Sequence, residues 1–430
     1  MSKYKRYERY KDSGVEWIGE IPEHWEVSKL KYLTYCLDGK RIPLSSEQRG
    51  EMQGDIPYWG ANCIIDYVND WLIDGEVVLL GEDGAPFFDK YKDVAFYSNG
   101  RIWPNNHVHV LRALQSINAK LLTYILNTVD YSNYIKGSTR DKLTQAEMKN
   151  IFIQLLPVRE QKAIVNFLDQ KTNKIDSLIA DKEKLIELLQ EKRQAIITEA
   201  VTKGLNTNAR MKDSGIEWIG EIPEHWRIAR LKFLKTSPFQ YGANEPAEKD
   251  DPQLPRYIRI TDINEKGELR EDTFKSLSWE SAQPYLLKDG DILFARSGAT
   301  VGKTFLYNKE LGYACYAGYL IRFKPDKNKV NSYYIYYYTL SKVYEEWIKQ
   351  NIIQATIQNV SAEKYGNLQV PLPPLEEQKR IVKYLNGKIE EIDILVESIY
   401  VQIQKLKEYR QSLISEAVTG KIDVRDYVID

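Results

Sequence analysis

Cysteine is scarce in this chain, and the few cysteines form no pattern. Only three occur among 430 residues, at Cys36, Cys63 and Cys315. Their odd number and wide spacing argue against a disulfide framework and against a cysteine-based zinc site. We expect all three to be reduced packing residues.

Histidine is almost as rare. The four histidines are His24, His107, His109 and His225. None belongs to an H-E-x-x-H motif or to a Cys/His cluster, so no metal site is expected. His24 and His225 each precede a tryptophan and are expected to pack. His107 lies in a polar loop. It could contact the edge of a base, or it could be hydrogen-bonded within the protein, and the sequence leaves both alternatives open.

Long apolar runs are also missing. No stretch approaches the ~18 residues of a membrane helix, and the basic, tyrosine-rich start from Met1 to Lys11 lacks the apolar core of a signal peptide. The hydrophobic fraction of 43% and the charged fraction of 28% are those of ordinary globular domains. We therefore expect a cytoplasmic protein without a membrane partner.

The net charge of −1 does not by itself indicate a nucleic-acid partner. Locally the balance differs: residues 101–142 carry six Lys or Arg against two Asp, and residues 286–324 carry six basic residues against three acidic ones. These two segments are candidates to face phosphates, although a patchy, solvated surface explains the same counts.

Signatures of catalysis are absent. The sequence contains neither a nucleophile elbow nor a dinucleotide glycine fingerprint. SGATVGKT, from Ser297 to Thr304, approaches a nucleotide phosphate loop, but Ser297 replaces the required glycine. The residues TFLY then predict a strand where that motif needs a helix. We interpret this segment as a turn between strands that presents Arg296, Ser297, Thr300 and Lys303.

What the chain does contain is a motif written twice. KDSGVEWIGEIPEHW runs from Lys11 to Trp25 and returns as KDSGIEWIGEIPEHW from Lys212 to Trp226, so that fourteen of fifteen positions match. A second pair, EQKAIVNFLDQKTNKID from Glu160 and EQKRIVKYLNGKIEEID from Glu377, keeps its register through ITEAVT and ISEAVT. The repeat is too long for a solenoid, and indicates a duplicated domain.

Each second motif begins a long predicted helix with a four-three apolar spacing. The first is expected to end at about Lys203, before Gly204. The expected seams are Ile164, Leu168, Lys171, Ile175, Leu178, Lys182, Leu185, Leu189, Lys192 and Ile196, and Ile381, Leu385, Lys388, Ile392, Leu395, Ile399, Gln402, Leu406, Tyr409 and Leu413. Within them we assign the helix interface to Ile164, Leu168, Ile175, Leu189, Ile381, Leu385, Ile392 and Leu406. Two equal helices in one chain are expected to pair antiparallel, with a globular segment at each end.

The segments between the motifs share an outline but little sequence. Strands are predicted at 76–80 and 108–112 with a helix at 119–129; their counterparts are strands at 289–295 and 319–323 and a helix at 331–348. The five tyrosines between Tyr333 and Tyr338 are interpreted as half core and half interface. Polar turns occupy matched positions in the two frames, and residues of these types suit phosphate or base-edge contacts. The candidates for such contacts are Asn105, Asn106, His107, Lys136, Ser138, Thr139, Arg140, Arg296, Ser297, Thr300, Lys303, Gln354, Thr356, Gln358 and Asn359.

Taken together, these motifs resemble the specificity subunits of type I restriction-modification enzymes. The residues that carry the likeness are the two copies of SGxEWIGEIPEHW, LPPLEEQKRIVKYL from Leu372, EAVTKGL from Glu199 and DILFARSGATVGK from Asp291. The resemblance implies an α+β chain with two homologous α/β target recognition domains separated by two long antiparallel coiled-coil helices, as a pseudo-twofold duplicated unit. The expected divisions are 1–157, first motif and recognition domain; 158–206, first helix; 207–372, second motif and recognition domain; and 373–430, second helix and tail.

The resemblance also implies a function. The subunit would be non-catalytic and would bind double-stranded DNA, each recognition domain reading half of a bipartite target. It would assemble with two adenine-N6 methylation subunits and two restriction subunits. S-adenosylmethionine, ATP and magnesium would be bound by those partners and no cofactor by this chain. Two alternatives remain: a coiled-coil scaffold without DNA readout, and a nucleotide-dependent enzyme in which Lys303 acts on phosphates.

Overall fold

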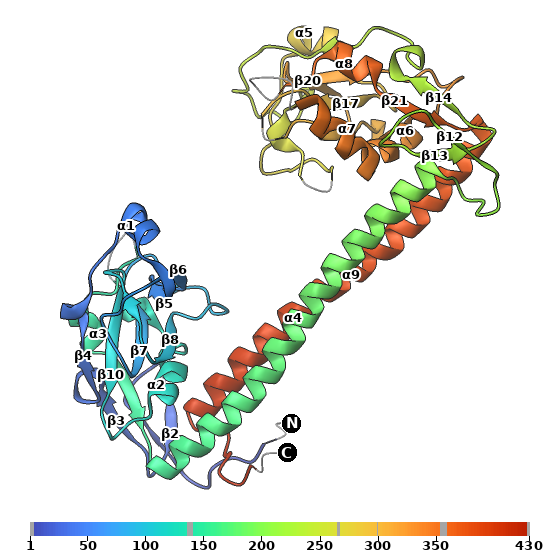
Figure 1. Cartoon of the computed structure of the whole chain (residues 1–430). Coiled ribbons are helices and arrows are strands. Elements are labelled where there is room, and N and C mark those ends of the chain that lie inside the picture. Colours follow the sequence, from blue (N-terminus) through green and yellow to red (C-terminus); the bar gives the residue numbers. More distant parts are fainter. Residues whose placement is uncertain (1–3, 136–140, 265–266, 299, 353–358, 428–430) are drawn as a thin grey trace. The chain divides into compact units, whose positions relative to one another are not determined.

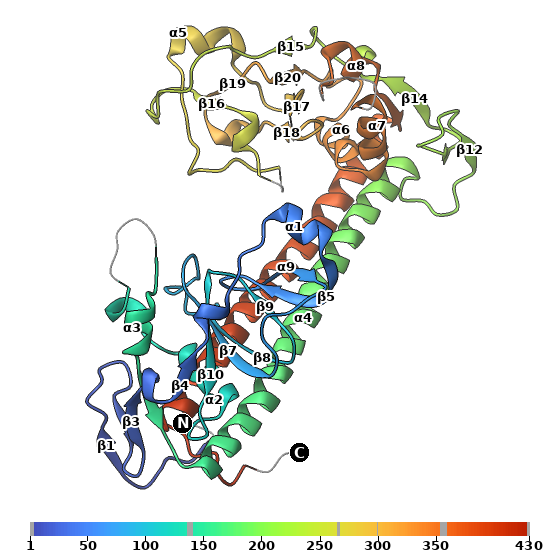
Figure 2. The ribbon, with the colours of Figure 1, turned by 60° about the vertical axis from the view of Figure 1, so that its left-hand side comes forward.

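The chain forms two compact units in a computed structural model that describes residues 4–135, 141–264, 267–298, 300–352 and 359–427. Unit 1 consists of Met1–Glu183 with Ile399–Asp430, and unit 2 consists of Lys184–Ser398. Each unit therefore holds one repeat motif, one variable segment and half of each long helix (Figures 1 and 2).

A four-stranded antiparallel sheet is the centre of each unit. In unit 1 the strand order is β4 (Thr34–Cys36), β10 (Val108–Ala113), β7 (Glu76–Gly81), β8 (Ala95–Asn99). In unit 2 the same order recurs as β15 (Gln240–Tyr241), β20 (Leu320–Phe323), β17 (Ile292–Ala295), β18 (Thr304–Leu306). Helix α2 (Ala119–Leu126) packs on β7 and β8, and α6 (Ser332–Thr339) packs on β18. The two variable segments thus share one frame, as their sequence outline predicts.

The repeated motif forms a hairpin followed by a strand. The hairpins are β1 (Tyr10–Asp12) with β2 (Glu20–Pro22), and β12 (Met211–Asp213) with β13 (Glu221–Pro223). The next strands, β3 (Glu26–Lys29) and β14 (Arg227–Arg230), pair with β11 (Phe152–Leu155) and β21 (Gln369–Leu372). Since β11 and β21 lead directly into the long helices, this pairing joins each motif to the start of a helix.

The units differ in what is added to this frame. Unit 1 carries α1 (Ser46–Glu51) and a small sheet of β6 (Ile64–Val68), β5 (Gln53–Trp59) and β9 (Trp103–Pro104). Unit 2 carries α5 (Trp279–Ala282) and a parallel pair, β16 (Arg256–Ile258) with β19 (Ala314–Tyr316). The remaining helices are α3 (Gln145–Lys149), α7 (Lys342–Ile352) and α8 (Ala362–Asn367), and the 3-10 turns are η1 (Leu30–Tyr32), η2 (Asp38–Lys40), η3 (Tyr131–Asn133), η4 (Leu231–Phe233), η5 (Ile260–Asp262), η6 (Gln283–Tyr285) and η7 (Lys309–Leu311).

The long helices are α4 (Val158–Thr202) and α9 (Leu375–Val418), and they pair antiparallel within each unit. In unit 1, Lys182 Nζ donates to Gln402 Oε1 at 2.6 Å, and Arg410 Nε lies 2.9 Å from Asp176 Oδ1. In unit 2, Arg193 Nε lies 3.7 Å from Asp393 Oδ1. The first helix ends as predicted, because Gly204 adopts a φ of 75° there.

The expected strict seam is wrong in detail. Leu178, Leu185 and Leu395 are exposed, whereas Ile186 and Ile197 are buried. The seven-residue repeat itself holds, because Leu385, Ile399 and Leu413 of the expected seam are buried along the length of α9. The second line of buried positions lies one residue later than expected from near the start of each helix, at Thr172 and Ile186 in α4 and at Ile389 and Ile403 in α9. The expected order of the four- and three-residue steps was therefore reversed, which is also why Tyr409 is exposed.

The two chain ends meet in unit 1. Lys5 forms an isolated antiparallel bridge with Asp423, and the rings of Tyr4 and Tyr427 both pack edge-on against Phe167. In unit 2, the continuous segment from Leu205 to Arg210 connects the end of a long helix to the repeated motif. In unit 1, the contact between the two chain ends takes the place of that connection.

Most predicted elements are present within a few residues. The exception is the predicted helix at 331–348, which is two helices, α6 and α7, divided at Leu340 and Ser341. Ser341 Oγ accepts a hydrogen bond from Tyr344 N–H and so begins the second helix. Among the described residues, no helix has both the length and the apolarity to cross a membrane.

Candidate nucleic-acid interface

The repeated His-Trp pair holds the first turn of each long helix. In unit 1, the Trp25 indole N–H donates to Glu160 at 2.9 Å and His24 Nε2 lies 2.7 Å from the same carboxylate. In unit 2, Trp226 and His225 contact Glu377 at 3.2 and 2.8 Å. Trp25 and Trp226 are almost completely buried. The motif is thus a packing device, as expected, and it also supplies hydrogen-bond donors.

The next residue, glutamine in both helices, ties in the variable segment. Gln161 accepts from Asn118 N–H at 2.7 Å and donates to Leu156 O at 2.8 Å. Gln378 accepts from Asn331 N–H at 2.8 Å and donates to Pro373 O at 2.9 Å. Asn118 and Asn331 cap α2 and α6. In each unit, the adjacent glutamate and glutamine of the long helix therefore fix the repeated motif, the helix and the recognition domain relative to one another.

Corresponding hydrogen bonds identify one locus in both recognition domains, at the end of the central strand. In the first domain, Glu82 N–H donates to His107 O at 2.9 Å and Leu143 N–H donates to Glu82 O at 2.7 Å. In the second, Arg296 N–H donates to Tyr319 O at 3.0 Å and Val360 N–H donates to Arg296 O at 2.8 Å. Glu82 and Arg296 therefore occupy the same position of the frame.

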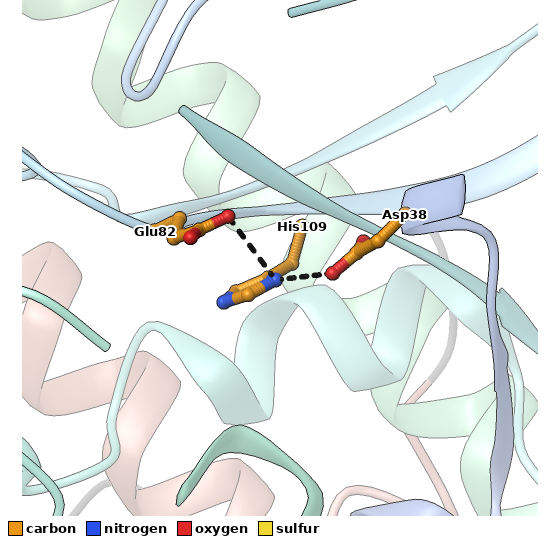
Figure 3. A group of neighbouring side chains, drawn as sticks. All are labelled: Asp38, Glu82 and His109. Atoms are coloured by element: carbon orange, nitrogen blue, oxygen red, sulfur yellow. Dashed lines mark hydrogen bonds and ion pairs between the residues drawn. The ribbon is translucent and has the colours of Figure 1, made fainter. Parts of the chain in front are cut away.

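At this locus the first domain holds a cluster of Asp38, Glu82 and His109 (Figure 3). His109 is 1% exposed, and its Nδ1 lies 2.7 Å from Asp38 Oδ2 and 3.7 Å from Glu82 Oε2. Its Nε2 lies 2.8 Å from Leu143 O. Arg41 contacts Glu82 at 2.5 Å, and Lys142 Nζ lies 3.2 Å from Glu82.

The cluster has the ligand types of a metal site, with three candidate atoms within 4.8 Å of one another. Two cations already contact Glu82, and both nitrogens of His109 face acceptors, so hydrogen bonds and ion pairs account for the arrangement. Burial raises the pKa of Asp38, but the hydrogen bond and charge of His109, with Val110 N–H and Arg41, outweigh burial and bring that pKa to about 2. We interpret the cluster as an internal ion-pair network.

The other first-domain candidates have different environments. Asn105 is buried, and its Oδ1 accepts from His107 N–H at 2.8 Å. Asn106 is exposed. His107 is partly exposed, with Nδ1 3.1 Å from Asp83 Oδ1. Lys136, Ser138, Thr139 and Arg140 lie outside the described residues.

In the second domain, three candidates gather at the locus. Ser297 and Asn359 form an isolated antiparallel bridge beside Arg296. The Arg296 guanidinium lies over the Tyr241 ring, 4.8 Å from its centre. Arg296 Nε, Thr300 Oγ1 and Asn359 Oδ1 are buried atoms without a hydrogen-bond partner in the described part of the chain. Gln354, Thr356 and Gln358 fall outside that part.

Lys303 has a different environment from Arg296. It lines a cavity of about 400 Å³ with Arg193 and Tyr344, whereas Arg296 does not line that cavity. Residues 300–302 form a turn that leads into β18, as the sequence predicts. The backbone of Lys303 is nevertheless close to the locus, because Ala295 N–H donates to Lys303 O at 2.8 Å.

Sequence reasoning missed Tyr241 and Tyr319. Tyr319 is 62% exposed and occupies the position of His107, since both residues accept from the residue at the strand end. The sequence outline matched the strand at 319–323 with the strand at 108–112, which begins directly after His107, so the sequence could have indicated Tyr319. Tyr241 lies far from Arg296 in sequence, and only the strand pairing brings it there.

The expected helix-interface residues lie along the paired faces. Ile164, Leu168, Ile175, Ile381, Leu385 and Ile392 are buried, and Leu189 and Leu406 are half-buried.

Comparisons with known proteins agree with this architecture. A Haemophilus influenzae protein provisionally named as a type I restriction enzyme specificity subunit is 28% identical over 402 residues, covering 90% of this chain and 94% of that protein. The EcoDI specificity subunit of Escherichia coli is 20% identical over 431 residues, covering 94% and 90%. A solved structure from work on assembly and conformational transition of a type I R-M system has the same fold, with a TM-score of 0.67 at 17% identity and coverages of 93% and 98%.

The family profile for the type I restriction modification DNA specificity domain matches the chain twice, over residues 22–188 and 241–405. These segments together span more than half of the sequence and contain both central sheets. The chain therefore belongs to the family of type I restriction-modification DNA specificity subunits.

Proposed function

We propose that each recognition domain reads one half of a bipartite sequence in double-stranded DNA. The supporting observation is that the same backbone hydrogen bonds present Glu82 in one domain and Arg296 in the other. A common frame with different side chains suits two different half-sites, because base edges are distinguished by donor and acceptor pattern. A scaffold without DNA readout is less well supported, since a DNA specificity profile matches both segments.

The proposed DNA contacts are the polar turns of both domains. They comprise Asn105, Asn106, His107, Lys136, Ser138, Thr139 and Arg140 in the first domain, and Arg296, Ser297, Thr300, Lys303, Gln354, Thr356, Gln358 and Asn359 in the second. Lys303 lines a cavity that Arg296 does not line, which favours a phosphate or structural role over base reading. Arg296 is the best supported member, because its environment lacks a carboxylate partner among the described residues.

The helices are proposed to set the spacer between half-sites and to dock two methylation subunits. Leu178 and Leu395, which occupy equivalent helix positions, are 49% and 52% exposed. Leu185, Leu188 and Ile394 of the same helices are exposed as well, and exposed apolar side chains in such number favour a further apolar partner. The complex would include two restriction subunits and act in the cytoplasm. Catalysis, with S-adenosylmethionine, ATP and magnesium, would belong to the partner subunits.

The test is a map of N6-methyladenine in plasmid DNA from cells that coexpress the chain with its methylation subunit. The map is repeated after residues 26–157 are exchanged for another recognition domain of the family. A bipartite motif in which one half changes is the expected result. Methylation that ignores the exchange, or none from an assembled complex, would contradict the proposal.

A further inference from the structure

The equivalent loci of the two recognition domains have opposite chemistry. The strand pairing places Tyr241 where the first domain has Asp38, and the hydrogen bonds at the strand end place Arg296 where it has Glu82. One domain thus has acidic side chains at positions where the other has a cation and an aromatic ring.

In the first domain this locus is internally neutralised. Glu82 contacts Arg41 and Lys142, and Asp38 lies against His109. Each carboxylate therefore already has a cationic or protonated partner. A base that contacted these carboxylates would have to displace an existing ion pair. The hydrogen bonds of that ion pair would be lost, which opposes the contact.

In the second domain the locus is unsatisfied. Arg296 Nε, Thr300 Oγ1 and Asn359 Oδ1 have no hydrogen-bond partner among the described residues. Unpaired buried polar atoms destabilise a fold and are uncommon in proteins. Two of these atoms, Arg296 Nε and Asn359 Oδ1, belong to the locus itself, since Asn359 forms a bridge with Ser297 and Val360 N–H bonds to Arg296 O. They indicate a ligand with its own acceptors and donors.

Tyr241 holds the arginine in place. Its hydroxyl accepts from Ala362 N–H, the first residue of α8, at 3.2 Å, and its ring lies 4.8 Å from the Arg296 guanidinium carbon. Stacking on an aromatic face orients the planar guanidinium and leaves its donor edge free. A flexible phosphate contact does not require such orientation, whereas a bidentate contact to the N7 and O6 atoms of guanine does.

We propose that Arg296, positioned by Tyr241, reads a guanine in the half-site of the second domain, and that the first domain makes no equivalent contact. This inference rests on the proposed bipartite recognition and assigns one residue and one base within it. Arg296 is the base-contacting residue, and Tyr241 is a positioning residue.

The experiment uses the full chain coexpressed with its methylation subunit and maps methylation for four variants. Arg296→Gln and Arg296→Lys are expected to lower the preference for guanine at one position of the second half-site by about tenfold to a hundredfold. Tyr241→Ala should relax the same position, and Tyr241→Phe, which keeps the ring, should retain the preference. The purified complexes are then assayed for binding to duplexes that differ only at that base pair.

Arg425→Gln is the matched control. Arg425 also lies 4.8 Å from a tyrosine ring, that of Tyr7, but Asp423 binds its guanidinium at 2.6 and 2.9 Å. This control is expected to leave both half-sites unchanged.

Three results would overturn the inference. The first is a second half-site that contains no guanine. The second is a guanine preference that is undiminished in both Arg296 variants. The third is an equal loss of affinity for every duplex, in variants that form the complex and keep the Tm of the unmodified protein. The last result would make Arg296 a phosphate contact. If the unmodified chain yields no bipartite motif, the proposed function fails instead. If the unmodified chain yields a bipartite motif and the Arg296 variants keep the same guanine preference, only this inference is contradicted.

Discussion

The indole N–H of Trp25 donates a 2.9 Å hydrogen bond to Glu160, joining the repeated motif to the first turn of α4. Tyr7 and His24 contact the same buried carboxylate. Glu160→Gln replaces the charged acceptor of the Trp25 and Tyr7 hydrogen bonds by a neutral amide, which weakens both bonds. We expect this change to destabilise unit 1 by about 1–3 kcal/mol.

Hydrogen exchange across residues 10–30 checks this prediction, because lost anchoring raises the local exchange rate. Glu377→Gln is the matched change in unit 2, where the bond from Trp226 is longer, 3.2 Å, and a smaller effect is expected. Unaltered exchange in Glu160→Gln would show that the carboxylate does not anchor the motif.

Arg410 anchors the first recognition domain to the helix pair of unit 1. Its guanidinium lies 3.4 Å from Asp93 and 2.9 Å from Asp176. Arg410→Met keeps the length but leaves both carboxylates unpaired, and we expect a loss of about 1–2 kcal/mol after allowance for their partial exposure. Arg193→Met, at the equivalent position of unit 2, removes one 3.7 Å contact to the mostly exposed Asp393 and should cost less. Thermal unfolding of both variants measures the difference, and equal losses would contradict it.

Asp38 makes the stability of unit 1 depend on pH under acidic conditions. Its pKa of about 2 lies below the ordinary value of 3.8, so the ionised form stabilises the fold. This contribution is complete above about pH 4 and is lost as the pH falls towards 2, and Asp38→Asn should therefore cost about 2 kcal/mol near neutral pH. Thermal unfolding of both proteins between pH 2 and 6 should show the difference shrinking below pH 4. A difference that does not change with pH would exclude ionised Asp38 as its source.

The exposed leucines of the helix pair provide a test of partner docking. Leu178→Gln combined with Leu395→Gln should leave the fold intact, because both side chains are about half exposed. If they contact the methylation subunits, each loss of apolar burial should weaken binding by roughly tenfold. Titration calorimetry with the purified methylation subunit measures this. Leu311→Gln, equally exposed in the second recognition domain, is the control. Unchanged affinity in the double variant would place the docking surface elsewhere.

The duplication made much of the fold predictable. Short strands such as EVVLL and DILFA, the long helices and the stop at Gly204 depend on local pattern and backbone preference, which the sequence displays directly. The break at Ser341 was missed because the tyrosines around it continue an apolar helical pattern, and the capping hydroxyl is a weak local signal. The predicted seam was wrong at every second position because apolar spacing alone does not determine which of the two alternating steps is four residues long, and the packing of the helices decides it.

By itself, the sequence determined that one unit occurs twice, where each long helix begins, and which polar turns occupy matched positions, because repetition and periodicity are properties of residue order. Only the tertiary structure decided that Glu82 is neutralised by Arg41 and Lys142, while Arg296 lies on Tyr241 with no hydrogen-bond partner for its Nε in the described ranges. Those environments are created by strand pairing between distant segments. Charge pairing and desolvation depend on distances of a few ångströms, and these are set when the sheet forms.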